Sequence, residues 1–353
     1  ACVDIYTQPG SQPDRVVLIV DVKDQSNGEF GVGGGCSSND GFTATVDITE
    51  RNFLGRGQFI RASVGGGSET REYSLSFTEP YFLGYRLAAG FDLFKTTDKS
   101  YNGFDEETQG INLRLGAPIT ENIYLSTAFK YSETKYSDYV LNATNIPSAP
   151  ELAAVSRTVA NGGHQIGALS YTLSYNTLDD QKLPREGISA RFTQEYAGLG
   201  FDSDYLKTTA KASYFHMLSE QADMIGQISV GAGNVVSTGD NLRVFDHLFV
   251  GQETIRGFES RGMGPRVFNG ATNVGAAGGT TYFNGTAEVS SPMPLMSREI
   301  GLRFNLFADA ATLYGNDISA ADFGGQTLVG SDMEWRASLG AGITWASPFG
   351  PLR

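Results

Sequence analysis

The chain has 353 residues, of which 40% are hydrophobic, 11% are aromatic and 44 are glycine. Its formal net charge of −13 argues against nucleic-acid binding, because no basic patch could balance the repulsion from phosphate. No apolar run reaches the roughly 18–20 residues that a membrane helix needs. This excludes a helical membrane protein but leaves open a β-barrel, whose strands alternate apolar and polar residues.

Residues 1–24 differ from the rest of the chain. Val16 to Val22 is a short, nearly continuous apolar run, which is more typical of a strand in a small α/β domain than of a membrane strand. We therefore expect two domains, the tail of such an α/β domain at 1–24 and a β-domain at 25–353.

Two cysteines, Cys2 and Cys36, stand before and within the first expected strand of the β-domain. In an oxidising compartment they could form a disulfide that ties the N-terminal segment to that strand. Two unpaired thiols or an engineered crosslink are the alternatives. Metal binding is not expected, because two cysteines and three scattered histidines give no ligand spacing.

A two-residue period dominates the remainder of the chain. In 42–49, four apolar residues alternate with three threonines and an aspartate, and 166–176 and 302–309 repeat the pattern. Successive strand residues point to opposite faces, so each such segment predicts a strand with one apolar and one polar face. The pattern predicts about fourteen strands, at approximately 29–38, 41–51, 58–68, 70–80, 86–97, 107–117, 122–134, 164–178, 186–198, 204–217, 222–236, 280–290, 299–314 and 333–347.

A soluble β-sandwich would show the same alternation, but three features favour a membrane barrel. The strands are long enough for a tilted membrane strand, about 9–12 residues each. Aromatic residues such as Tyr81 and Tyr136 gather at strand ends, as interfacial girdles do. The polar faces also carry ionised groups, which a wet lumen tolerates and a dry core does not. These groups are Arg114, Lys130, Arg191, Lys207, Lys211, Arg303 and Asp309.

Two segments between the expected strands are long. Segment 137–163 is rich in Ser, Asn, Pro and Ala and is predicted to be a surface loop, and segment 237–279 is the longest gap. The latter contains Ile255, Arg256, Gly257 and Phe258. A loop of that length tends to be functional, and a passive barrel has little reason to keep a guanidinium there.

Several stretches, in this order, resemble the BamA/TamA superfamily of outer-membrane insertases and transporters, and the BamA family in particular. Ile255 to Phe258 resemble its loop signature, with Ile where Val is commoner. The other matching stretches are 16–22, 50–57 (Glu-Arg-Asn-Phe-Leu-Gly-Arg-Gly), 78–82 (Thr-Glu-Pro-Tyr-Phe), 176–187 and 347–352 (Ser-Pro-Phe-Gly-Pro-Leu). The resemblance implies an all-β fold, a transmembrane antiparallel β-barrel of the 16-stranded type. It also implies that the last one or two strands are lacking here and that 1–24 is the tail of a periplasmic POTRA domain.

The same resemblance implies a function without covalent chemistry or cofactor: insertion and folding of other β-barrel proteins in the outer membrane of Gram-negative bacteria. In that family the first strand is an edge that opens laterally and templates a client by β-augmentation. Here that strand carries Gly31, Gly33, Gly34 and Gly35, and glycine weakens a strand. The implied partners are unfolded barrel clients, accessory assembly lipoproteins and outer-membrane lipid, with the N-terminal segment in the periplasm.

Arg256 needs carboxylate partners if its loop enters the lumen. Strand parity offers Glu288 and Asp309, and by resemblance these correspond to the acidic residues that receive the loop arginine. A turn centred near Leu295 would set Arg303 opposite Glu288 and place Asp309 roughly 20 Å further along. A longer turn would bring the two carboxylates closer. A solvated loop arginine is the alternative.

Other functions remain open. A two-partner secretion or TamA-like transporter would share the arginine loop, and a passive porin or receptor barrel would share the fold. An enzyme is not expected, because a barrel hydrolase needs a nucleophile with a positioned base. His164, His216 and His247 stand in no evident Ser/Asp constellation and are predicted to be ordinary loop or interface histidines.

Overall fold

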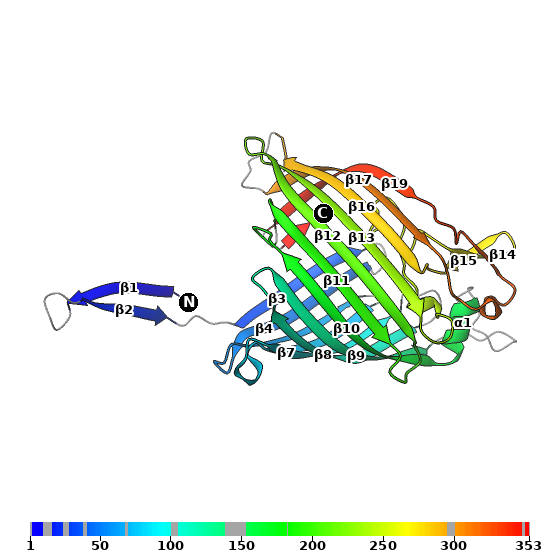
Figure 1. The fold of residues 1–353 in the computed structure, drawn as a ribbon, viewed down its shortest axis with the longest axis horizontal. Coiled ribbons are helices and arrows are strands. Elements are labelled where there is room, and N and C mark those ends of the chain that lie inside the picture. Colours follow the sequence, from blue (N-terminus) through cyan, green and yellow to red (C-terminus); the bar gives the residue numbers. More distant parts are fainter. Residues whose placement is uncertain are drawn as a thin grey trace.

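The computed structural model describes residues 2–9, 16–23, 28–37, 41–67, 70–99, 105–137, 153–181, 183–294, 301–347 and 350–352. The dominant element is one antiparallel sheet of 15 strands, which curls into the barrel seen in Figure 1. The predicted membrane-barrel fold is therefore confirmed at the level of its architecture, and each of the expected strands has a counterpart. In chain order they are β3 (Gly28–Ser37), β4 (Gly41–Phe53), β5 (Gln58–Gly67), β6 (Thr70–Glu79), β7 (Ala88–Asp98), β8 (Asp105–Pro118), β9 (Ile123–Ser137), β10 (Gly163–Asn176), β11 (Gly187–Ala197), β12 (Tyr205–Ser219), β13 (Met224–Ser237), β16 (Thr281–Pro292), β17 (Leu302–Tyr314), β19 (Arg336–Ser347) and β20 (Gly350–Leu352).

Each strand of the barrel pairs with the strands that precede and follow it, from β3 at one edge to β20 at the other. Within the described ranges no pairing joins β3 to β20. The three longest connections, 138–162, 238–280 and 315–335, leave the same end of the sheet, and the short turns 54–57, 80–87 and 220–223 lie at the opposite end. Short turns at one end and long loops at the other are typical of outer-membrane barrels.

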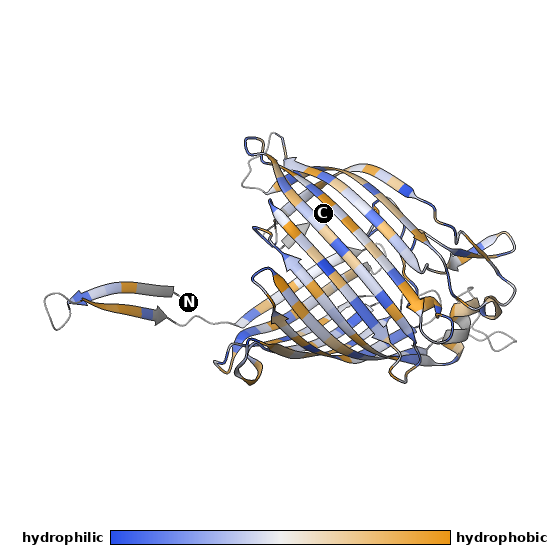
Figure 2. Cartoon of the chain, in the orientation of Figure 1, coloured by the Kyte–Doolittle hydropathy of each residue, from blue (hydrophilic) through white to orange (hydrophobic). Residues whose placement is uncertain are grey.

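The two faces of the sheet differ in chemistry, and Figure 2 shows the resulting alternation along the strands. The register places all seven ionised residues predicted for the polar face on one side of the sheet. The opposite side carries exposed apolar residues, including Leu113, Leu169, Ile228, Leu306 and Leu339. The loop 238–280 packs on the polar side, so that side is the lumen and the apolar side is the outer wall.

Helix α1 (Ala153–Ala160) and the small sheet of β14 (Arg266–Asn269), β15 (Thr272–Ala276) and β18 (Thr327–Val329) lie in the long connections. Segments 137–163 and 237–279, predicted to be loops, therefore connect barrel strands but contain short regular elements. These connections share an apolar cluster, hereafter the cap, whose buried members are Tyr136, Ala154, Val155, Val159, Val244, Val267, Ala277, Ile318 and Phe323. Tyr136 is thus a cap residue and not part of an interfacial girdle, because its side chain points to the lumen face and meets the loops.

Residues 2–9 and 16–23 form a separate two-stranded sheet, β1 (Cys2–Pro9) with β2 (Val16–Lys23). The apolar run 16–22 is a strand as predicted, and a preceding strand pairs with it along its length. Its assignment to a POTRA domain stays a prediction. No helix in the described ranges is both long and apolar enough to cross a membrane.

Candidate functional site

The site is built on the loop between β13 and β16, residues 238–280, hereafter the arginine loop. Its tip packs against the lumen face of β16 and β17 through a buried apolar cluster of Val250, Ile255, Met263, Ala311 and Leu313. Ile255 is completely buried. A β-branched side chain buried there fixes the neighbouring backbone, so the position of Arg256 is set by packing before any charge is considered.

Arg256 is bound by two carboxylates of the barrel wall. Its Nε and Nη2 donate to the two oxygens of Asp309, each at 2.7 Å, and its Nη1 donates to Glu288 at 2.6 Å. The backbone N–H of Arg256 also donates to Asp309, at 3.1 Å. The planar guanidinium fork allows this two-bond contact with one carboxylate, which lysine could not make.

The carboxylates are more deeply buried than the arginine. The side chain of Asp309 is 1% exposed and that of Glu288 is 8% exposed, against 27% for Arg256. Two buried negative charges on one lumen wall require a cation nearby, and Arg256 contacts both of them. The site is therefore a triad in which the loop supplies the charge that the wall needs.

The register of β16 and β17 explains how the two acids meet. Asp309 lies opposite Thr286, and Glu288 lies opposite Phe307, so the acids occupy diagonal positions on one face. Pro292 lies opposite Arg303. The turn is therefore the longer of the two alternatives, and the arrangement with Arg303 opposite Glu288 was wrong. Proline lacks the N–H needed to extend the ladder, which is consistent with β16 ending at Pro292.

Phe307 belongs to the site and was missed by the sequence-based prediction. Its ring lies under the guanidinium, with the Arg256 carbon Cζ 3.5 Å from the ring centroid. Such a cation–π contact adds to the two ion pairs. The alternation of faces along the strand could have identified it, because Phe307 is an aromatic residue on the same face as Arg303, Asn305 and Asp309.

The other two residues of the loop signature have local roles. Gly257 has φ +87°, and a Cβ at this position would meet no atom within 4 Å. Glycine is thus favoured for its backbone conformation and not for lack of space. Phe258 packs partly buried against the apolar cluster around Ile255.

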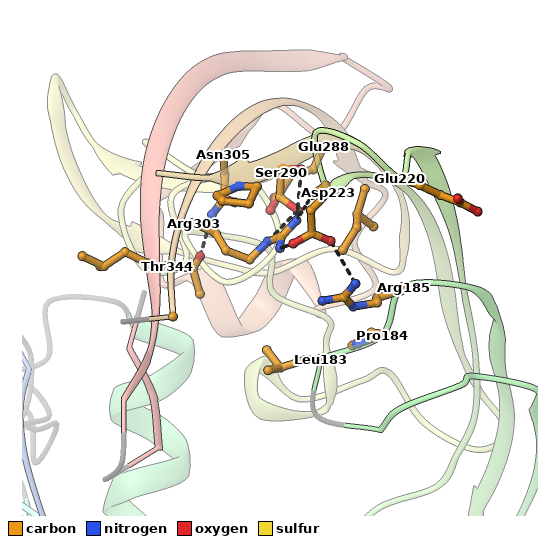
Figure 3. Close-up of a pocket in the computed structure, with 14 residues that line it drawn as sticks. Leu183, Pro184, Arg185, Glu220, Asp223, Glu288, Ser290, Arg303, Asn305 and Thr344 are labelled. Atoms are coloured by element: carbon orange, nitrogen blue, oxygen red, sulfur yellow. Dashed lines mark hydrogen bonds and ion pairs between the residues drawn. The ribbon is translucent and has the colours of Figure 1, made fainter. Parts of the chain in front are cut away.

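Two cavities flank Glu288 on the lumen side. One of about 390 Å³ lies toward the loop and is lined by polar residues of β12, β13 and β16 together with Arg256 and Asp309. The other, of about 440 Å³, lies toward the short turns and is shown in Figure 3. There Asp223 forms ion pairs with Arg303 at 2.8 Å and Arg185 at 2.9 Å. Arg303, the alternative neighbour of Glu288, is therefore engaged elsewhere.

The base of the arginine loop is held by the cap. Asp246 is buried, accepts a hydrogen bond from Ser203 at 3.0 Å and forms an ion pair with Arg243 at 3.1 Å. His247 donates from Nδ1 to the Arg243 carbonyl at 2.8 Å, and its Nε2 accepts from the Asp317 N–H at 3.0 Å. Burial lowers the pKa of His247 below its usual value, against the raising effects of that carbonyl, Asp246 and Asp317.

The remaining histidines and the cysteines lie elsewhere. His164 is a residue of β10 with a ring 6.1 Å from that of Phe245, and His216 is an exposed residue of β12. Cys2 lies in β1 and Cys36 in β3. The side chains of both cysteines lie outside the described residues, so the proposed disulfide stays a prediction.

The glycines of β3 differ in what surrounds them. A Cβ at Gly31 would lie 2.7 Å from a carboxylate oxygen of Asp47, whereas the nearest atoms to Gly33, Gly34 and Gly35 would be 3.5 Å away or more. Only Gly31 is therefore needed to make room for a neighbour. Phe30 and Val32, the residues on either side of Gly31, are 70% and 72% exposed.

Comparison with known proteins places this arrangement in a family. A family profile described as the Omp85 superfamily domain matches residues 52–353. The outer membrane protein assembly factor BamA of Neorickettsia risticii is 29% identical over 342 residues, which cover 96% of this chain and 43% of that protein. The BamA of Neisseria meningitidis serogroup B is 25% identical over 365 residues, covering 97% of this chain and 46% of that protein.

This chain therefore spans less than half the length of these relatives. Among solved structures, the crystal structure of BamA from Haemophilus ducreyi lacking POTRA domains 1–3 superposes with a TM-score of 0.76 at 22% identity. That alignment covers 99% of this chain and 70% of the other. At this identity the likeness establishes the fold.

Proposed function

This chain belongs to the Omp85 superfamily, and from that premise we propose that it is the barrel of an outer-membrane β-barrel assembly factor. The observation that carries the proposal is its similarity to proteins named BamA over at least 96% of its length. In this proposal the barrel is integral to the outer membrane, its apolar outer wall contacts lipid, and its short turns and N-terminal segment face the periplasm. It acts on unfolded barrel proteins without covalent chemistry, and accessory lipoproteins assist it.

The mechanism that we propose uses the edge at β3. An unpaired edge strand offers a row of N–H and C=O groups to which an incoming strand can add. In the described ranges β3 pairs on one side only, with β4. Half of its ten residues are glycine, so few side chains hold it in place. These features support a client strand pairing with β3 while the barrel wall parts at this seam.

The arginine loop has the complementary role in this proposal. The triad of Arg256, Glu288 and Asp309 holds the loop on β16 and β17, close to the β20 edge of the sheet. A fixed loop keeps that wall in one geometry while the β3 side changes its pairing. The loop is therefore a brace for the barrel and not the contact point for the client.

The proposal is tested by depletion of the intact protein from its own cells. We expect unrelated outer-membrane barrels to stop reaching the membrane, and plasmid-borne wild-type protein to restore them. A crosslink between β3 and the final strand of the intact protein should fail to restore assembly until it is reduced. Undiminished assembly after depletion would show a transporter or a passive pore instead. Full rescue by the crosslinked protein would refute only the opening at β3.

A further inference from the structure

Two turns at the short-turn end of the barrel have the same sequence core and the same backbone. The turn between β4 and β5 contains Phe53-Leu54-Gly55, and the turn between β6 and β7 contains Phe82-Leu83-Gly84. In both turns the leucine and the glycine have positive φ, +55° and +70° in the first and +54° and +82° in the second.

The hydrogen bonds of the two turns also correspond. Gly55 and Gly84 each donate to the carbonyl three residues earlier, both at 2.9 Å. The next residues, Arg56 and Tyr85, donate to the carbonyls of Phe53 and Phe82 at 3.3 and 3.2 Å. Two consecutive left-handed residues closed by such a bond define a turn in which Asn, Asp or Gly normally takes the first central position.

Leucine is an unfavourable residue for that position. A bulky side chain at positive φ is an outlier, because its Cβ approaches the following carbonyl. Backbone strain of this kind tends to persist where the residue has a use beyond local stability. Neither leucine is used in packing, since Leu54 is 74% exposed and Leu83 is 78% exposed.

The two turns form one surface. A Cβ at Gly57 would lie 4.0 Å from Cγ of Pro80, and Glu79 accepts from Gln58 at 2.7 Å and from the Tyr81 N–H at 3.0 Å. Around the leucines are exposed aromatic residues, Tyr81 at 61% and Tyr85 at 72%.

Each turn also carries an exposed arginine, Arg56 or Arg86. Leucine, tyrosine and arginine together are typical of segments that lie in a membrane interface, where tyrosine and arginine meet the head groups and apolar side chains reach the acyl chains.

The surroundings indicate lipid as the occupant. On the outer wall just before the turns lie Ile60, Phe77 and Phe91, which the register places side by side, so the patch continues the apolar wall. Figure 1 shows these blue turns at the left end of the barrel, outside its lower wall and away from the lumen. The guanidinium groups of the turns complement the phosphates of anionic phospholipids.

We propose that Leu54 and Leu83 are membrane anchors, inserted into the periplasmic leaflet of the outer membrane with Tyr81, Tyr85, Arg56 and Arg86 at the phospholipid head groups. Because β4 is the one described partner of β3, the anchor fixes the depth of the wall that adjoins the opening edge. This inference rests on the proposed membrane location but not on the proposed assembly activity.

The test adds one tryptophan at a time to the intact protein, which is reconstituted in vesicles of phosphatidylethanolamine and phosphatidylglycerol with or without bromine on the acyl chains. The variants are Leu54→Trp and Leu83→Trp, with Leu113→Trp on the outer wall as the lipid reference and Leu199→Trp at the opposite end of the barrel as the aqueous reference. Quenching of the native tryptophans, Trp335 and Trp345 among them, is subtracted with wild-type protein. We expect brominated lipid to quench the tryptophans at 54 and 83 nearly as strongly as the one at 113, and iodide to leave them unquenched.

Three other results would overturn the anchor. Iodide quenching at 54 and 83 with the strength seen at 199 would place the tips in water. Protection from both quenchers would mean that a protein surface covers them. A lack of bromine quenching even at 113 would refute the membrane location itself, and with it both the anchor and the proposed function.

A second pair of variants separates anchoring from folding. Leu54→Asn and Leu83→Asn remove the apolar tip but introduce a residue that accepts the left-handed conformation. In detergent the double variant should unfold at the same or a higher urea concentration than wild type. In vesicles its urea midpoint should fall, whereas Leu199→Asn should change neither. A double variant with an unchanged midpoint in vesicles would contradict the anchor.

Discussion

On β16 and β17 a whole loop is packed, and its arginine is held by two carboxylates that are 1% and 8% exposed. On β3, half of the residues are glycine, and Phe30 and Val32 are 70% and 72% exposed. Both walls belong to one sheet with the same alternation of residues. The difference shows that this sheet concentrates its buried tertiary contacts on one side. On the other side β3 is held by backbone hydrogen bonds to β4 and by an exposed ion pair of Glu29 with Arg51, at 3.1 Å.

The arrangement has a mechanical consequence. A wall fixed by buried charges has one low-energy geometry, because any shift leaves a carboxylate without its cation. A wall of glycine has few side-chain contacts to lose. Pairing changes at the β3 edge are therefore less costly than changes at β16 and β17, as the proposed opening at β3 would require.

The largest effect is expected from Arg256→Ala. Removing the guanidinium leaves the buried carboxylates of Asp309 and Glu288 without the cation that contacts them, which destabilises docking of the arginine loop by about 3–5 kcal/mol. Protease accessibility and amide hydrogen exchange of the loop in whole cells measure the change. Arg86→Ala, at an exposed turn, serves as the matched control. Equal protection of the loop in both variants would mean that the triad does not hold the loop.

Ile255→Ala tests the apolar half of the same wall. Truncating a fully buried isoleucine costs about 2–5 kcal/mol, depending on how well the cavity collapses. The loop should exchange faster, but less so than in Arg256→Ala if the ion pairs remain formed. Leu339→Ala is the control, since this side chain is 85% exposed on the outer wall. Loop exchange at the wild-type rate in Ile255→Ala would mean that packing does not position the arginine.

On the glycine-rich side, Gly33→Ala should strengthen the strand by about 0.5–1 kcal/mol. The added Cβ would meet only Thr45 Oγ1, at 3.9 Å. Under the proposed function, barrel assembly by the intact protein should slow, because the β3 edge would open less readily. Gly31→Ala is the comparison, since its Cβ would press on Asp47 at 2.7 Å and give no such gain. Faster assembly in Gly33→Ala would contradict the weak-edge account.

The smallest effect is expected from pH and is confined to the cap. Burial lowers the pKa of His247 below its usual 6.5, so the unfolded loop binds a proton at a pH where the folded loop does not. Cap stability is therefore complete above about pH 6.5 and is lost as the pH falls from there through the folded pKa. The protection factor near Asp317, which is the intrinsic exchange rate divided by the observed one, should fall between pH 7.5 and 5.5 in wild type and remain flat in His247→Gln. Equal slopes in the two proteins would exclude this histidine.

The sequence alone sufficed for the strands because the signal is local. Alternation in segments such as 166–176 and 302–309 depends only on successive side chains pointing to opposite faces. The same alternation predicted that Glu288 and Asp309 lie on the polar faces of their strands. Their separation could not be predicted, because it depends on the length of the turn after Pro292, and a turn length has no periodic signal.

Other features needed the folded chain. Phe307 contributes through its place under Arg256, which follows from the register of β16 and β17. Leu54 and Leu83 lie in gaps between expected strands, after 41–51 and after 70–80, but leucine propensity gives no reason to expect φ near +55° there. The cap was missed because its buried residues come from three connections that are distant in sequence.

The most direct test of whether the triad holds the arginine loop is a double-mutant cycle on Arg256 and Asp309. Loop protection is measured by hydrogen exchange in wild type, Arg256→Ala, Asp309→Asn and the double variant, all in the intact protein in vesicles. We expect a coupling of about 1–3 kcal/mol, with the double variant less damaged than the sum of the two single changes. Additive effects with no coupling would contradict it, because they would mean that the loop and the wall are held by something other than this ion pair.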